Sequence, residues 1–135
     1  MKSDFVFLKL DADLPSSWNL KSKFNVTGYP TVVFANEKGE EIDRIIGSRE
    51  PDAFVASMRK ILNQKNTSFD EKKSKADLNN DLKAAYEVGV AYLKRDQFSL
   101  AHFYLLKASR GWDSKDQRRN KLLTAQLGIN AKLND

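Results

Sequence analysis

The sequence predicts an α/β unit in the first half of the chain and an all-α unit in the second. Short runs of aromatic and β-branched residues in the first half are typical of buried strands, whereas from residue 82 onward apolar residues recur with the 3.6-residue period of helices. The polar, charged stretch over residues 63–75 indicates a linker or the frayed start of a helix. We therefore expect a β-α-β-β-α unit over residues 1–63, a linker over 64–78, and a helical hairpin with a capping helix over 79–135.

Three segments of the first half have strand character. Residues 5–10 (FVFLKL) are mostly apolar, which predicts a strand buried on both faces. Thr31–Ala35 is a second run of this kind. A tight turn at Asn36–Gly39, in which Gly39 is free to adopt a positive φ, then leads into a return strand over Glu41–Ile46.

The return strand is expected to have one inward and one outward face. Successive side chains of a strand point to opposite faces, so Ile42 is expected to point inward. Its charged neighbours, Glu41 and Asp43, are expected to point outward.

Two helices accompany these strands. Pro15 opens a short helix in which Trp18 is expected to lean on the core. Pro51 suits the first position of a second helix, and Asp52 suits its positive dipole end. Apolar residues spaced i, i+4, i+7 and i+8 predict that this helix packs through one face. These residues are Phe54, Met58, Ile61 and Leu62.

The absence of cysteine is the most restrictive feature of the composition. Among the 135 residues there is no cysteine and a single histidine, His102. Disulfides, thiolate zinc sites, iron–sulfur clusters and thiol nucleophiles of this chain are thereby excluded, as is a histidine-rich metal site. The sequence implies no cofactor. It contains no apolar run long enough to span a bilayer, and residues 1–13 lack the apolar core of a signal peptide.

The net charge of +5 is confined to the second half of the chain. Residues 1–63 carry nine Lys/Arg and nine Asp/Glu, whereas residues 64–135 carry fourteen and nine. A basic set in this half offers two interpretations, a nucleic-acid surface or a solvated helical face, and we favour the solvated face because acidic residues interrupt the set. Its members are Lys107, Arg110, Lys115, Arg118, Arg119 and Lys121.

The first half resembles the later part of a thioredoxin fold. The segments that carry the resemblance are Leu8–Asp13 (LKLDAD), Lys23–Thr31 (KFNVTGYPT), Gly39 and Gly47. The resemblance covers residues 5–62 and implies a partial thioredoxin-like α/β fold. It also implies a cis Tyr29–Pro30 bond that shapes a substrate groove, so that Tyr29, Pro30 and Thr31 form the substrate-binding wall. From the residues alone, and without neighbouring cysteines, we favour the interpretation that the same turn only shapes the sheet.

The chain departs from the thioredoxin-like pattern upstream of residue 5. The family's Cys-x-x-Cys helix and the central strand before it would precede this point, so the chain is not a redox catalyst as given. Without that strand, residues 5–10 and Thr31–Ala35 would face a gap with unpaired edges. Three explanations remain open: direct antiparallel pairing, a strand from another copy or chain, or origin as the C-terminal piece of a longer protein. We favour the third for the origin, with a swapped strand filling the gap in a homodimer.

The second half resembles a tetratricopeptide repeat over residues 82–115. The helices are expected to approach each other at Gly89 and Ala101, while Tyr92 and Leu105 fill the space between them. Because one repeat cannot bury its own face, the helix over residues 116–133 is expected to cap it. The register positions are Ala85, Val88, Gly89, Tyr92, Ala101, Leu105 and Ala108.

Aromatic residues of the helical unit are candidates for contacting a partner. Phe103 and Tyr104 are adjacent, so at most one can point fully inward, and the other can line a peptide-binding surface. Trp112 is the third candidate. Asp11 and Asp13 could form a carboxylate pair, but loop or capping roles are more typical at the end of a strand.

Two functional hypotheses follow. The first is a non-catalytic fragment or partner-dependent form of a thioredoxin-like thiol–disulfide oxidoreductase family protein. The second is a protein–protein interaction module that uses a thioredoxin-like scaffold and a helical surface. Both imply a protein or peptide partner, whereas nucleic-acid binding is a weaker third hypothesis. Related proteins with thioredoxin-like domains are often exported, but we assign no compartment.

Overall fold

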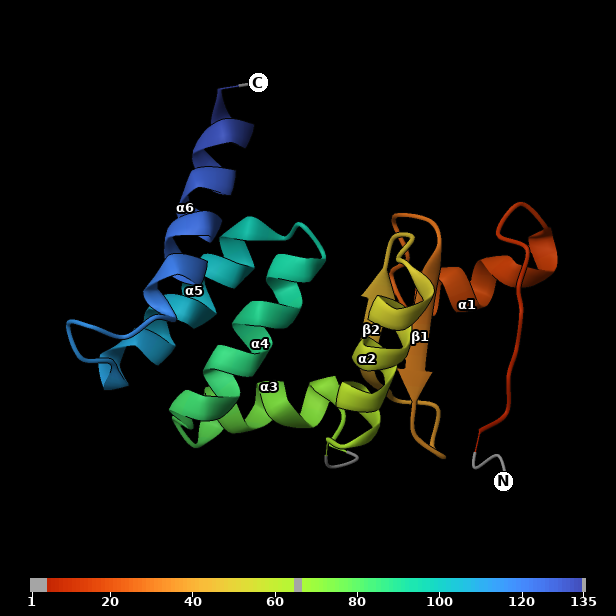
Figure 1. The fold of residues 1–135 in the computed structure, drawn as a ribbon, viewed down its shortest axis with the longest axis horizontal. Helices are drawn as coiled ribbons and strands as arrows, with labels where there is room; N and C mark the ends of the chain where they lie inside the picture. Colours follow the sequence, from red (N-terminus) through yellow and green to blue (C-terminus); the bar gives the residue numbers. More distant parts are fainter. Residues whose placement is uncertain (1–4, 65–66, 135) are drawn as a thin grey trace.

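The computed structural model describes residues 5–64 and 67–134. This part of the chain is mixed α/β and mostly helical, with six α-helices, two short 3-10 turns (η) and a two-stranded antiparallel sheet (Figure 1). The elements are η1 Pro15–Ser17, α1 Trp18–Lys23, β1 Thr31–Ala35, β2 Glu41–Ile46, α2 Pro51–Leu62, α3 Phe69–Leu78, α4 Leu82–Lys94, α5 Phe98–Ala108, η2 Ser109–Gly111 and α6 Arg119–Leu133.

The sheet confirms two of the three expected strands and the turn between them. β1 and β2 pair from Thr31 opposite Ile46 to Phe34 opposite Asp43, with a shift in register after Phe34. In the connecting turn Gly39 has a φ of 74°. The Asn36 side chain accepts hydrogen bonds from the N–H groups of Lys38 and Glu40 at 3.0 Å each, which closes the turn.

The expected strand over residues 5–10 is wrong. This segment forms no strand and follows an extended path on the β1 side of the sheet (Figure 1). Val6 is 99% exposed and Phe7 is 85% exposed, so the segment is buried on neither face. A strand requires a hydrogen-bonded neighbour, and β1 pairs with β2 alone in the described part of the chain.

The core of the α/β half is small. α2 begins at Pro51 as expected and packs on β2, where Ile45 and Ile61 are the buried apolar residues. Phe54 and Met58 are half-buried, while Leu62, expected on the same face, is 39% exposed. The sheet half therefore has little apolar burial of its own.

The expected linker over residues 64–78 contains a helix. Ser68 begins α3 with a reciprocal capping box: its hydroxyl accepts from the Glu71 N–H at 3.2 Å, and its own N–H donates to the Glu71 carboxylate at 2.9 Å. Ala76 of α3 is fully buried against the helical unit. The polar composition concealed this helix, because its stability comes from the cap and from packing on α4.

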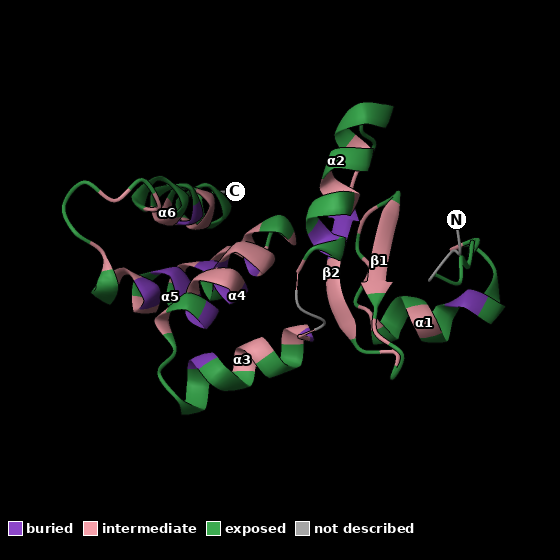
Figure 2. Ribbon diagram, turned by 60° about the horizontal axis from the view of Figure 1, so that its bottom comes forward, coloured by how far each residue is buried: buried purple, intermediate pink, exposed green. Residues whose placement is uncertain are grey.

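The main core lies in the α4–α5 hairpin (Figure 2). Gly89 allows the close approach expected from the sequence, since a Cβ built there would lie 2.7 Å from the side chain of Leu105. Tyr92 stacks on Tyr104 with ring centroids 5.7 Å apart. α6 packs on α5, and Gly128 meets the ring of Phe98. The buried cluster of this unit is Ala76, Ala84, Ala85, Val88, Tyr92, Ala101, Tyr104, Leu105, Ala108 and Ala125.

We expect Gly89→Ala to destabilise the helical unit. The new methyl group would also lie 3.0 Å from the backbone N of Leu105, which cannot move aside as a side-chain tip can. Overpacking costs about 1–3 kcal/mol, which exceeds the gain of about 1 kcal/mol that alanine has over glycine in a helix. Urea unfolding followed by circular dichroism measures the change in the free energy of unfolding.

The matched control for this prediction is Gly28→Ala. A Cβ at Gly28 meets nothing within 4 Å, so the substitution should leave stability unchanged or raise it by up to about 1 kcal/mol. A Gly89→Ala variant as stable as Gly28→Ala would contradict the close approach of α4 and α5.

Candidate functional site

The Tyr29–Thr31 segment lies between α1 and β1. Its Tyr29–Pro30 peptide bond is cis, as the resemblance implied. The Thr31 hydroxyl donates to the Gly28 carbonyl at 2.7 Å, and the Pro30 carbonyl accepts from the Gly47 N–H at 2.9 Å. The polar groups of Pro30 and Thr31 therefore serve to hold the turn.

Tyr29 differs from its two neighbours because its polar groups are available. Its side chain is 57% exposed. Within residues 5–64 and 67–134, neither its backbone N–H nor its backbone C=O has a hydrogen-bond partner. Exposed backbone groups of this kind can pair with an extended peptide.

A shallow, open depression adjoins this segment. It has a volume of about 340 Å³ and is lined by Trp18, Lys21, Ser22, Asn25 and Val26. The Lys21 ammonium lies 5.4 Å from the centroid of the Tyr29 ring and so connects the depression to the segment. Trp18 is 56% exposed, so the expectation that it leans on the core is wrong. Together these groups offer two aromatic surfaces, one cation and two free backbone groups.

Of the three aromatic candidates in the helical unit, only Phe103 presents an open ring. Tyr104 is 3% exposed and belongs to the core, so it cannot contact a partner. Trp112 is half-buried, with its ring edge-on to Tyr86 and the Arg118 guanidinium 5.2 Å above it. Phe103 is 57% exposed. It lies on α5 in an exposed apolar row with Leu100 and Leu106.

Tyr104 instead fastens α5 to α3 through a carboxylate. Its hydroxyl donates to Asp77 at 2.9 Å, and the Lys73 ammonium donates to the other Asp77 oxygen at 3.0 Å. Two hydrogen bonds lower the pKa of Asp77: the one from Lys73 has the larger effect and the one from Tyr104 the smaller. The pKa of Tyr104 is raised, mainly by burial and secondly by the hydrogen bond to Asp77. The carboxylate is thus stabilised in its charged form.

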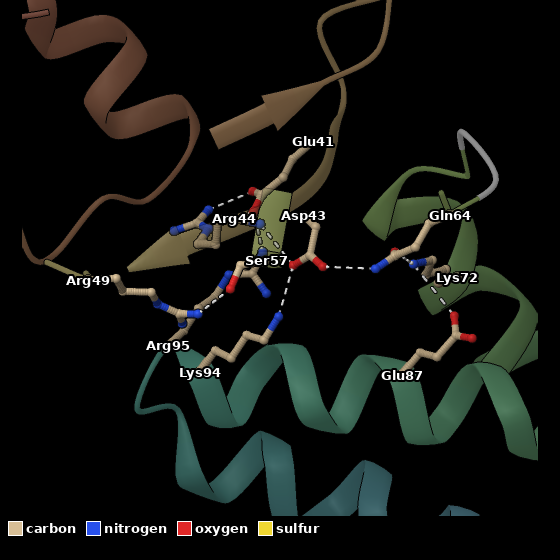
Figure 3. A network of polar contacts seen from close by, with 10 residues as sticks. All are labelled: Glu41, Asp43, Arg44, Arg49, Ser57, Gln64, Lys72, Glu87, Lys94 and Arg95. Carbon is tan, nitrogen blue, oxygen red and sulfur yellow. Dashed lines mark hydrogen bonds and ion pairs between the residues drawn. The ribbon is translucent and has the colours of Figure 1, made fainter. Parts of the chain in front are cut away.

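Sequence reasoning missed a polar cluster where the sheet meets the helical unit (Figure 3). The Glu41 carboxylate accepts two hydrogen bonds from Arg44, both at 2.6 Å, and one from Arg95 of the α4–α5 turn, also at 2.6 Å. These side chains are only 12%, 4% and 10% exposed, respectively. The expectation that Glu41 points outward is therefore wrong.

Both arginines of this cluster have further contacts. Arg44 donates to the carbonyl of Phe24 at 2.6 Å, which attaches the end of α1 to β2. The Arg95 guanidinium lies 4.5 Å from the centroid of the Phe69 ring, and its buried Nη1 atom has no hydrogen-bond partner among the described residues. Burial lowers the pKa of Arg95. The cluster joins the two halves of the chain, because Arg95 of the helical unit donates to Glu41 of β2.

A second set of contacts runs along the same junction. Asp43, also expected to point outward, is largely buried and accepts from Lys94 at 3.3 Å and from Gln64 at 3.4 Å. Lys72 donates to Gln64 at 3.3 Å and pairs with Glu87 at 3.5 Å. Figure 3 shows these side chains converging from β2, α3, α4 and the end of α2.

Several of the remaining charged candidates make contacts within the chain. Asp11 accepts a hydrogen bond from the Asp13 N–H at 3.0 Å, which supports the loop role. Arg118 pairs with Asp116 and lowers the pKa of that carboxyl to about 2, while Lys107 donates to the Ala76 carbonyl. The Lys121 ammonium lies 5.8 Å from the centroid of the Tyr86 ring, so at least three members of the basic set are engaged within the chain.

Neither a metal centre nor a membrane-spanning helix is present in the described residues. They contain no group of three or more His, Cys, Asp or Glu side chains that could hold a metal ion. No helix within these residues combines the length and the apolar character needed to cross a bilayer.

We expect Glu41→Gln to destabilise the chain strongly. The substitution removes the carboxylate that pairs with two largely buried guanidinium groups, and breaking a buried pair in this way costs about 3–5 kcal/mol. The matched control is Lys94→Ala, which removes an ion pair whose lysine is 42% exposed and should cost less than about 1 kcal/mol. Urea unfolding compares the two variants, and equal losses would show that Glu41 does not anchor the junction.

The Asp77 contacts predict a dependence of stability on pH. Because the folded-state pKa of Asp77 is lowered, its contribution is present above the ordinary value of 3.8 and is lost as the pH falls through the folded-state value. Asp77→Asn should therefore flatten the fall in melting temperature in this acidic range. Tyr104→Phe, which removes the smaller of the two hydrogen bonds, should flatten it less. If the melting temperatures of wild type and Asp77→Asn fall identically with pH, the lowered pKa of Asp77 is refuted.

Comparison with known proteins adds no relative. No protein-family model matches the chain. No curated protein matches it. No solved structure matches it either.

Proposed function

We propose that this chain is a non-catalytic, thioredoxin-like protein that binds an extended segment of a protein partner at the Tyr29–Thr31 wall. One observation carries the proposal: Tyr29 combines an exposed ring with a backbone N–H and C=O that have no partner in the described part of the chain. An extended peptide can pair with such groups as a strand pairs with its neighbour.

The surroundings of Tyr29 favour a particular class of peptide. The Tyr29 and Trp18 rings offer apolar contact, while Lys21 lies between the ring and the depression. This arrangement suits an apolar side chain with an acidic residue close to it. Aromatic residues are well suited to anchoring a partner because they contribute large apolar areas.

Binding in this proposal is separate from redox chemistry. Thiol–disulfide exchange requires a thiolate to attack a disulfide sulfur, and the chain has no cysteine. In an insulin-reduction assay we expect no turnover above background, whereas measurable turnover would refute a non-catalytic role.

We expect Tyr29→Ala to weaken peptide binding about tenfold, the equivalent of about 1.4 kcal/mol. A reduced and alkylated, permanently unfolded polypeptide with a fluorescent label serves as the probe, and its anisotropy reports affinity. Phe103→Ala is the matched control, because Phe103 is also 57% exposed and lies on the other half of the chain.

The same pair of variants tests the second candidate function, an interaction module that binds through its helical surface. The exposed row of Leu100, Phe103 and Leu106 on α5 favours this candidate. Weaker binding by Phe103→Ala, with Tyr29→Ala unaffected, would replace the first proposal with the second. Probe binding that neither variant alters would contradict both.

A further inference from the structure

Residues 6–10 form an exposed, extended apolar segment, which we call the N-terminal segment. Val6, Phe7 and Leu8 expose 99%, 85% and 68% of their surfaces, and Leu10 exposes 46%. Consecutive side chains of an extended chain point to opposite sides, so both sides of this segment are apolar. Such a composition is typical of a strand covered on both faces.

The sheet has a complementary feature in the free edge of β1. Among the described residues β1 pairs with β2 alone, which leaves its second edge without a ladder. A two-stranded sheet is marginal by itself, and an apolar edge strand is a template for a further strand. β1 has five residues (TVVFA) and carries no charge. β1 therefore matches the N-terminal segment in length, and both are mostly apolar.

The segment does not fill this edge in its own copy. Residues 11–30, including η1 and α1, connect the two, and the segment lies apart from β1 on the free-edge side of the sheet (Figure 1). A segment and an edge that suit each other but do not pair within one copy can pair between two copies.

We propose that two copies of this chain exchange their N-terminal segments, each segment adding as a strand to the free edge of the other copy's β1. The two segments also pair with each other at the centre, giving one continuous six-stranded sheet in the order β2, β1, segment, segment, β1, β2. This inference is independent of peptide binding at Tyr29.

The composition of the chain supports a second copy as the occupant. Within the described residues, the N-terminal segment is the one extended apolar stretch that lies outside the sheet. Lys9 is its sole charge. Antiparallel pairing centred between Phe7 and Leu8 places each Lys9 opposite Val6, so the two lysines do not face each other. The two-fold arrangement uses both segments and both β1 edges, so the assembly closes at two copies.

To test this proposal, sedimentation equilibrium over a concentration series measures the oligomeric state of the whole chain. Wild type should form a reversible dimer, and Leu8→Pro should convert it to a monomer because proline cannot donate a hydrogen bond to a ladder. Asn134→Pro, just beyond the end of α6, is the matched control and should remain dimeric. Circular dichroism checks the fold, which Leu8→Pro should preserve because the segment belongs to no core cluster.

Cross-linking gives a second readout, made clean by the absence of native cysteine. Mixed copies carrying Phe7→Cys and Leu8→Cys should form a disulfide-linked heterodimer on mild oxidation, because these positions face each other across the two-fold axis. Leu133→Cys is similarly exposed at the far end of the chain and should not cross-link. A monomeric wild type, a dimer that survives Leu8→Pro, or equal cross-linking at Leu133 would overturn the proposal. None of these results bears on Tyr29→Ala, so the two proposals fail separately.

Discussion

The Glu41 carboxylate is the contact on which the arrangement of the two halves depends. It accepts from Arg44 of its own strand and from Arg95 of the α4–α5 turn, and all three side chains are largely buried. The desolvation of buried charges offsets much of their attraction, so such a cluster contributes less to net stability than to a defined geometry. Removing the Glu41 carboxylate takes a hydrogen-bond acceptor from both cations, whereas an apolar junction would tolerate many orientations. The sheet is therefore positioned by a directional interaction.

The two halves differ in how much of their own surface they bury. The helical unit has a continuous cluster of buried residues, whereas Ile45 and Ile61 supply the buried apolar residues of the sheet half. The two features on which our leading proposals rest, Tyr29 and the N-terminal segment, both belong to the half with the smaller core. This distribution has a physical basis: groups that are not consumed by internal packing are the ones available to another polypeptide.

Local patterns predicted the parts of the fold that depend on neighbours in sequence. The β1–β2 hairpin, the start of α2 at Pro51 and the close approach at Gly89 follow from turn chemistry, proline geometry and helical spacing. Residues 5–10 failed as a strand because a strand also needs a neighbour that no local pattern supplies. Alternation in β2 could not show that Glu41 and Asp43 meet Arg95 and Lys94 at the end of α4. Glu41 and Arg95 are 54 positions apart, and nothing near either residue identifies the other.

Ion pairs at this junction involve part of the uneven charge of the chain. Residues 1–63 are neutral and the excess of positive charge lies beyond them, a pattern compatible with a nucleic-acid surface. Yet Lys94 and Arg95 of the basic half pair with Asp43 and Glu41 of the neutral half. The acidic residues of β2 thus neutralise part of the excess where the halves meet, and Arg118 is paired with Asp116. Opposite charges placed on the facing surfaces of two units favour one docking orientation over others. Part of the charge asymmetry is accordingly a property of how the chain packs on itself.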